Sequence, residues 1–122
     1  DSLLILKDGK LMAMGSPLAI YNNPPNAYAA TLLAKSNILS RKQVSSLLPA
    51  IQKDQIIIHP EWLSVAENPL GTFEIHSILF KGFYEEILLQ DQMLQLRWIN
   101  KNPRQYRVGQ RVDVKVDNFV AY

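Results

Sequence analysis

Two short apolar runs near the start of the chain, Leu3–Leu6 and Leu11–Met14, flank the dipeptide Asp8-Gly9. This dipeptide readily adopts the positive φ angles that a two-residue hairpin turn needs. The sequence therefore predicts an antiparallel hairpin here. Because most of its side chains are apolar, we expect another part of a larger protein to cover it.

Capping residues predict two helices after this hairpin. Ser16 can accept a hydrogen bond from the free amides of a following helix, and Pro17 fits the first helical position, so a short helix is expected at Leu18–Tyr21. The Asn- and Pro-rich residues that follow should end it. A second helix is expected over Asn26–Lys35, which is rich in alanine.

The order of these segments resembles the C-terminal end of import ATPases of the ATP-binding cassette (ABC) family, of the maltose, polyamine, sulfate and iron types. The similar segments are Leu4–Leu11 (LILKDGKL), Gly15–Tyr21 (GSPLAIY), Pro24–Ala30 (PPNAYAA), Ile56–Leu63 (IIIHPEWL), Ile78–Gly82 (ILFKG) and Val108–Val112 (VGQRV). Together they extend over nearly the whole chain.

The resemblance implies a mainly β fold with short helices and three parts. Residues 1–36 would be the last hairpin and helices of a nucleotide-binding domain. For residues 37–54 the sequence itself predicts a linker with a short helix at Gln43–Leu48, which Ser40 could cap. This departs from the family, whose members commonly carry extra strands here. Residues 55–122 would form the transport-associated OB (TOBE) regulatory domain, a small OB-like antiparallel barrel. ATP and magnesium would bind in the parent subunit, outside this region.

The function implied is that of an accessory, regulatory domain of an importer's ATP-binding subunit, which makes subunit contacts and senses a ligand or partner. Its partners would be the nucleotide-binding domain of the same subunit, a second ATPase subunit in a homodimer and the membrane permease subunits. Such a subunit is cytoplasmic and peripheral to the inner membrane.

The sequence also argues against ATP hydrolysis by this region alone. The chain has only 5 glycines and no G-x-x-x-x-G-K-[ST] loop, whose backbone amides would cradle phosphates. Leu39–Gln43 superficially resembles the family's Leu-Ser-Gly-Gly-Gln signature, but Arg41 and Lys42 replace both glycines. Their side chains would prevent close approach to a nucleotide.

From Gln55 onward the apolar period falls to two, which predicts four or five short strands. The buried faces are expected to carry Val112, Val114 and Val116 in the last strand and Leu94, Leu96 and Trp98 in an earlier one. Between Thr72 and Phe80 the apolar parity shifts, which predicts a bulge. Several short antiparallel strands with one apolar face favour a small closed barrel of the OB type.

Three glycines are interpreted as structural turn residues rather than ligand contacts. Gly9 belongs to the first hairpin, Gly82 follows an apolar strand, and Gly109 precedes the last strand. Each position is expected to need a positive φ angle.

The segment His59-Pro60-Glu61 is the candidate contact site. On an extended chain His59 and Glu61 would lie on one face around Pro60 and could pair. The family usually carries arginine at the position of His59, in a segment where the regulatory domain meets the nucleotide-binding domain or a partner subunit. A histidine there would be only partly charged at neutral pH, which predicts a weaker or pH-sensitive contact. The alternative is a surface histidine with no coupling role.

Other chemistry finds little support in the residues. The chain has 2 histidines and no cysteine, so a metal site is not expected. Glu85 and Glu86 are adjacent on a strand and face opposite sides, so they are interpreted as part of a solvated surface rather than a catalytic pair. No apolar run approaches the roughly 20 residues that cross a bilayer.

Two other functions remain open. OB barrels often bind single-stranded nucleic acid, and basic and aromatic residues gather near the C-terminus: Arg97, Trp98, Lys101, Arg104, Tyr106, Arg107 and Arg111. The net charge of +2 is low for such a platform, and Trp98 has core parity, so no nucleic-acid partner is expected. The second possibility is a domain that binds a small anion or metabolite, as relatives of the module do.

Overall fold

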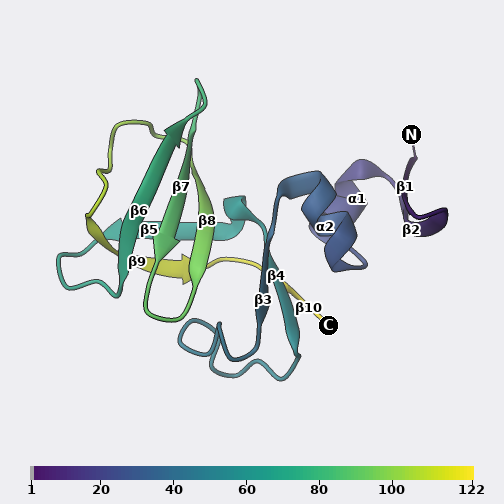
Figure 1. The fold of residues 1–122 in the computed structure, drawn as a ribbon, viewed down its shortest axis with the longest axis horizontal. Coiled ribbons are helices and arrows are strands. Elements are labelled where there is room, and N and C mark those ends of the chain that lie inside the picture. Colours follow the sequence, from purple (N-terminus) through teal and green to yellow (C-terminus); the bar gives the residue numbers. More distant parts are fainter. Residues whose placement is uncertain (1) are drawn as a thin grey trace.

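The computed structural model describes residues 2–122, apart from the side chains of residues 32–34. It is mainly β with two short α-helices, as predicted (Figure 1). The elements are β1 (Leu3–Lys7), β2 (Lys10–Gly15), α1 (Pro17–Asn22), α2 (Ala27–Ala34), β3 (Asn37–Ser40), β4 (Gln55–Ile58), the 3₁₀ turn η1 (Pro60–Trp62), β5 (Leu63–Glu67), β6 (Phe73–Phe80), β7 (Glu85–Gln90), β8 (Gln95–Asn100), β9 (Arg111–Val116) and β10 (Val120–Ala121). Its strands form three antiparallel sheets, ordered β1-β2, β10-β4-β3 and β5-β9-β6-β7-β8.

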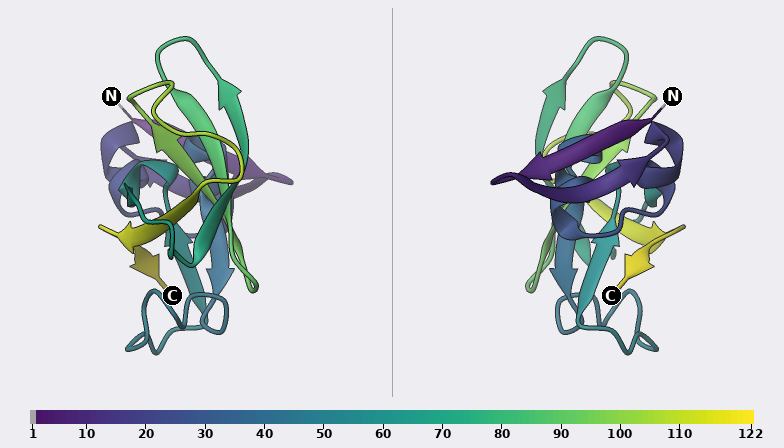
Figure 2. Two further views of the ribbon diagram at one scale, coloured as in Figure 1. Left: turned by 90° about the vertical axis from the view of Figure 1, so that its left-hand side faces the viewer. Right: turned by 90° about the vertical axis from the view of Figure 1, so that its right-hand side faces the viewer.

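The predicted N-terminal hairpin is confirmed. β1 and β2 pair antiparallel around Asp8 and Gly9, which have φ angles of 52° and 78°. Ile5 and Ala13 are buried on one face of the hairpin, where they form a small core with Ile20 and Ala29 of the two helices. The hairpin lies at one end of the molecule, with the helices between it and the sheets (Figures 1 and 2).

Both predicted helices are also confirmed, with their capping residues. Ser16 Oγ accepts a hydrogen bond from the Ala19 amide at 3.2 Å, and Pro17 is the first residue of α1. Asn26 Oδ1 accepts one from the Ala29 amide at 2.9 Å. The Asn26 amide group also donates to the Met12 carbonyl at 2.6 Å, so this cap fixes α2 against β2.

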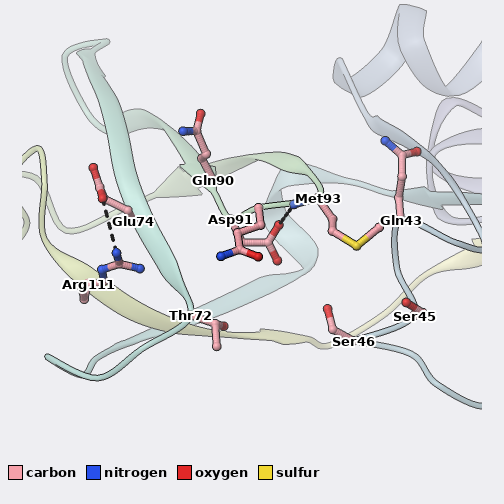
Figure 3. Close-up of a pocket in the computed structure, with 10 residues that line it drawn as sticks. Gln43, Ser45, Ser46, Thr72, Glu74, Gln90, Asp91, Met93 and Arg111 are labelled. Atoms are coloured by element: carbon pink, nitrogen blue, oxygen red, sulfur yellow. Dashed lines mark hydrogen bonds and ion pairs between the residues drawn. The ribbon is translucent and has the colours of Figure 1, made fainter.

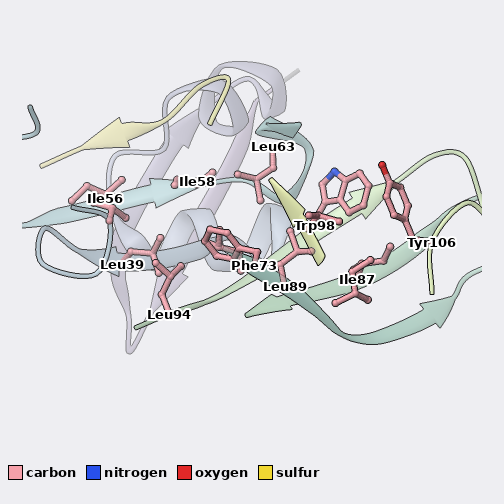
Figure 4. Close-up of a cluster of buried hydrophobic side chains, with 14 residues drawn as sticks. Leu39, Ile56, Ile58, Leu63, Phe73, Ile87, Leu89, Leu94, Trp98 and Tyr106 are labelled. Carbon is pink, nitrogen blue, oxygen red and sulfur yellow. The ribbon is translucent and has the colours of Figure 1, made fainter. Parts of the chain in front are cut away.

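The main core lies in the five-stranded sheet and follows the predicted alternation. Leu94, Leu96, Trp98 and Val112 are buried, together with Phe73 of β6 (Figure 4). Val114 and Val116, which were also expected on the buried face, are only partly buried against this core. The predicted bulge is confirmed too, because the β6–β7 register shifts between Ile75 and Ser77. The apolar side of β6 therefore changes partway along the strand.

This five-stranded antiparallel sheet agrees with the predicted OB-like fold, and its hydrogen-bonded strand order is β5-β9-β6-β7-β8. β5 and β9 run across the direction of β7 and β8 (Figure 1). Within residues 2–122, β5 and β8 form the two edges, and no pairing joins them. The turn η1, which leads directly into β5, lies next to β8 instead.

The helix predicted at Gln43–Leu48 is wrong. Residues 41–47 form hydrogen-bonded turns, and the preceding β3 pairs with β4 from Asn37↔Ile58 to Ser40↔Gln55. Apolar side chains on β3 and these turns, including Leu39 and Val44, join the main core, and this burial outweighs the local helical pattern. Residues in this segment are thus packed into the fold.

Asn37 connects the three-stranded sheet to the five-stranded sheet. Its side-chain oxygen accepts a hydrogen bond from the Arg97 amide at 2.7 Å, and its nitrogen donates to the Arg97 carbonyl at 2.9 Å. The same nitrogen lies 3.1 Å from the Ile58 carbonyl. One side chain therefore takes the place of a neighbouring strand at the edge of β8.

We predict that Gly71→Ala strongly destabilises the protein. A Cβ at this position would lie 2.2 Å from the Val112 carbonyl oxygen, so β9 would have to move. The expected loss is about 3 kcal/mol in the free energy of unfolding, measured by urea denaturation.

Gly82→Ala is the matched control. A Cβ there has nothing within 4 Å and only the φ angle of +97° opposes it, so the expected cost is about 1 kcal/mol. Equal losses in the two variants would contradict the close-contact explanation.

Candidate functional site

His59-Pro60-Glu61 does not form the extended segment that the sequence suggests. Pro60 begins the 3₁₀ turn η1, which is closed by a 2.9 Å hydrogen bond from the Trp62 amide to the His59 carbonyl. Proline favours this first position because its φ is already set and its missing amide costs nothing there. In this turn His59 and Glu61 do not share one face, and the expected direct pairing between them does not form.

His59 is buried between the helical part of the chain (α1 and α2) and the β part, which follows from β3 onward. Its side chain is 0% exposed, so the interpretation as a surface histidine is wrong. Its Nε2 lies 2.5 Å from the Tyr21 carbonyl at the end of α1, and its Nδ1 contacts the Ser36 hydroxyl after α2. The ring packs on Tyr21 and Trp62, with centroid distances of 4.3 and 4.1 Å.

The hydrogen bonds define which form of His59 fits. Because a carbonyl only accepts, Nε2 must carry the proton that it donates to Tyr21. In the neutral ring Nδ1 then accepts from the Ser36 hydroxyl. In the protonated ring Nδ1 would donate to Ser36 instead, and the hydroxyl would turn to the Ala30 carbonyl, 3.2 Å away.

Burial lowers the pKa of His59 from its usual value of 6.5. Removing the ring from water disfavours its charged form, and this effect exceeds the opposing effects of the Tyr21 carbonyl and of Glu61. The neutral form therefore predominates at neutral pH.

Glu61 also contacts Tyr21, through the tyrosine hydroxyl rather than through the backbone carbonyl. Its Oε1 accepts a hydrogen bond from the Tyr21 hydroxyl at 3.0 Å, and its Oε2 lies 3.5 Å from Lys101 Nζ. Burial, and next the hydrogen bond to Glu61, raise the pKa of Tyr21 to about 12. Tyr21 is thus the shared partner of His59, through its backbone, and of Glu61, through its hydroxyl.

We call His59, Glu61 and the residues that contact His59 the His59 junction. Three of its members, namely Tyr21, Ser36 and Trp62, were not predicted from the sequence. Tyr21 ends a correctly predicted helix, but nothing in its spacing relates it to residues some 40 positions later. Ser36 was noted only as the end of the second helix. Their roles depend on the tertiary contact between α1 and η1, which no local pattern encodes.

The other singled-out residues lie elsewhere and have structural roles. Glu85 and Glu86 face opposite sides of the strand, as predicted. The solvated surface expected for both is wrong for Glu85, which is buried. Glu85 accepts hydrogen bonds from Asn100 Nδ2 at 3.2 Å and from the Arg104 amide at 3.3 Å. Glu86 pairs with Arg97 at 3.3 Å. Gly82 and Gly109 have φ angles of 97° and 88°, as turns require.

The aromatic residues of the basic C-terminal cluster are not available for stacking on bases. Trp98 and Tyr106 are buried in the main core and contact each other edge to face at 5.5 Å. The Tyr106 hydroxyl donates to the Val65 carbonyl at 3.2 Å. A single-strand platform needs exposed aromatic faces, and these two rings do not provide them.

Metal-binding clusters and membrane-spanning helices are absent from residues 2–122. In the described part of the chain, no group of three or more His, Cys, Asp or Glu side chains could hold a metal ion. No helix within residues 2–122 is long and apolar enough to cross a membrane.

Comparison with known proteins supports the resemblance seen in the motifs. No family model matches the chain. A curated protein, the spermidine/putrescine import ATP-binding protein PotA of Desulfitobacterium hafniense (strain Y51), is 27% identical over an alignment of 133 residues. The alignment covers 95% of this chain and 38% of that protein. The chain is similar to part of an ABC import ATPase.

This similarity supports the prediction, made from the order of the motifs, that the chain corresponds to the C-terminal region of such an ATPase. The chain spans 38% of the relative's length, so the relative contains much that is not represented here. The junction around His59, by contrast, is built entirely from residues of this chain.

The lowered pKa of His59 predicts a pH-dependent stability. Below about pH 6.5 the unfolded chain binds a proton at His59 that the folded chain does not, so the free energy of unfolding falls as the pH falls from 7 toward the lower folded pKa. The slope from this one group is at most about 1.4 kcal/mol per pH unit. Urea denaturation at a series of pH values between 5.5 and 7.5, roughly the range in which histidine titrates, measures it.

His59→Gln should flatten this dependence, because glutamine can donate to Tyr21 and accept from Ser36 without titrating. The matched control is His76→Gln, at an exposed position of β6, which should leave the slope as in the wild type. An unchanged slope in His59→Gln would contradict the assignment.

Proposed function

We propose that this chain is the C-terminal part of the ATP-binding subunit of an ABC importer, in which it serves as an accessory, regulatory region. The observation that carries the proposal is the similarity to PotA along 95% of the chain, in agreement with the order of the motifs. Residues 1–36 would complete a nucleotide-binding domain, and the β structure that follows would be its TOBE regulatory domain. That domain would comprise residues 55–122, with the segment 37–54 attached to it through the pairing of β3 with β4.

In this proposal the region acts by contact rather than by catalysis. ATP and magnesium would bind in the remainder of the subunit, which would work as a homodimer with membrane permease subunits at the cytoplasmic side of the inner membrane. The cargo named for the relative is not transferred to this chain, because permease and receptor select the cargo of an importer.

The junction around His59 suggests how the two parts would be coupled. A movement of α1 that accompanies nucleotide binding would move Tyr21, whose carbonyl and hydroxyl are held by His59 and Glu61. The β part would then either move together with α1 or lose its contacts with Tyr21. Ligand or partner binding on the β part would bias the same equilibrium, since such coupling is reciprocal.

The exposed face of the hairpin would pack against the rest of the nucleotide-binding domain. Leu4, Leu6, Leu11 and Met14 are all more than half exposed, although Ile5 and Ala13 on the opposite face are buried. Apolar side chains grouped on one side of a hairpin favour a partner surface. In the separate chain, this face and the unpaired strand edges would instead favour self-association.

We therefore predict that the separate chain forms a dimer, measured as its mass by light scattering. Leu4→Glu combined with Leu6→Glu should convert it to a monomer, because charges at these exposed positions would be desolvated in the dimer. Leu70→Glu, at a position that is 90% exposed and outside the hairpin, is the control and should remain dimeric. A wild-type monomer would contradict the prediction.

A chimera tests the proposed function. The segment of PotA from D. hafniense that aligns with this chain is replaced by residues 1–122, and the chimeric subunit is assembled with its permease. We expect ATP turnover and transport to be retained, while the chain alone hydrolyses no ATP. The Leu4→Glu/Leu6→Glu chimera should lose both activities, because the hairpin could no longer pack, whereas Leu70→Glu should keep them.

A chimera that folds and assembles but shows no turnover would contradict the proposal. ATP hydrolysis by the separate chain would contradict it as well. A chimera with the double substitution that retains full activity would show that the hairpin face is not the contact.

A further inference from the structure

A cleft lined mainly by polar residues lies where the turns at residues 41–47, the β7–β8 turn and the starts of β6 and β9 meet. It shares no residue with the His59 junction. Its volume is about 660 Å³, which lies within the usual range for small-molecule sites. In Figure 3, Glu74 and Arg111 lie at one end of the view, Gln43 and Ser46 at the other, and Asp91 between them.

The cleft is lined by two carboxylates, Glu74 and Asp91, and one guanidinium, Arg111. Arg111 lies 3.9 Å from Glu74, and both side chains are about half exposed. Asp91 Oδ1 accepts hydrogen bonds from the backbone amides of Met93 and Leu94, at 2.7 and 2.8 Å. These hydrogen bonds stabilise the Asp91 carboxylate and hold it in place. Because Glu74 is paired with Arg111, the cleft as a whole carries only a small net negative charge.

Several neutral polar groups in the cleft are available to a ligand. Ser46, Thr72 and Gln92 line the cleft at exposed positions, so their hydroxyl and amide groups are accessible. Gln43 Oε1 accepts from the Ser40 amide at 2.9 Å, which fixes this side chain and leaves its amide hydrogens without a partner among residues 2–122. The cleft thus offers hydroxyl and amide groups from two separate parts of the fold.

We propose that this cleft binds a neutral polyhydroxylated molecule, a sugar or a polyol. A hydroxyl group both donates and accepts, so one hydroxyl could accept from Arg111 and donate to Glu74 across a separation that is long for a direct hydrogen bond. The uncharged groups suit further hydroxyls. An anion would meet the carboxylates of Glu74 and Asp91, and a cation would meet Arg111.

Ligand binding would connect the turns that follow β3 with the five-stranded sheet. Ser46 and Gln43 belong to the first, and Thr72 and Gln92 to the second. The bound form should therefore be more resistant to unfolding than the free form, by mass action. This proposal does not depend on the ABC assignment, because it uses only residues of the cleft.

Two-dimensional NMR of the full 122-residue chain tests the proposal, with glucose, maltose, sorbitol and myo-inositol as probes. At least one probe should shift the amide signals of Gln43, Ser46, Thr72 and Gln92 in a saturable way. Thr72→Val combined with Gln92→Ala should weaken this binding about tenfold, because two hydrogen bonds are lost. Both positions are exposed, so the fold should be unchanged.

Gln105→Ala, at an exposed position outside the cleft, is the matched control and should bind as the wild type does. Phosphate and putrescine are the charged probes. The proposal is overturned if no neutral probe shifts these signals, if the double variant binds equally well, or if a charged probe binds the cleft more tightly. None of these results bears on the chimera, so the two proposals can fail separately.

Discussion

The structure depends on the burial of one imidazole ring, that of His59, between elements that are far apart in the chain. The ring bonds to the Tyr21 carbonyl at the end of α1 and to the Ser36 hydroxyl after α2, and it packs on two aromatic side chains. A buried ring of this kind must satisfy both nitrogens, so its position fixes the helical part relative to η1 and β5. Arginine at this position would place a permanent charge in this enclosed space.

A second buried polar residue, Asn37, joins the three-stranded sheet to the five-stranded sheet. His59 joins the two helices to η1 in the same way. Its side chain replaces a neighbouring strand for Arg97 while its own strand pairs with β4. Arg97 in turn donates to the Lys35 carbonyl at 3.0 Å, at the end of α2. The three parts of the molecule therefore meet in a short region, Lys35 to Asn37, next to the ring of His59. A continuous set of contacts therefore links the helices beside the hairpin to the five-stranded sheet.

Much of the local structure could be predicted because its causes are local. Asp8-Gly9 requires a tight turn, Ser16 and Asn26 supply side-chain caps, and alternation in β8 and β9 separates a buried face from an exposed one. The candidate site was found only as a segment. Its geometry was not predictable, since Tyr21, the shared partner of His59 and Glu61, comes from α1. The strand β3 was missed because the strand that pairs with it, β4, lies later in the chain.

The sequence by itself determined the hairpin, the two capped helices, the bulge in β6 and the apolar core positions, since these follow from backbone preferences and side-chain alternation. Only the tertiary structure decided that His59 is buried, that Tyr21 joins it to Glu61, that Glu85 is enclosed and that a polar cleft forms beside β6. The physical reason is that burial and hydrogen-bond partners depend on segments brought together in space. A residue's own neighbours in the chain do not specify those segments.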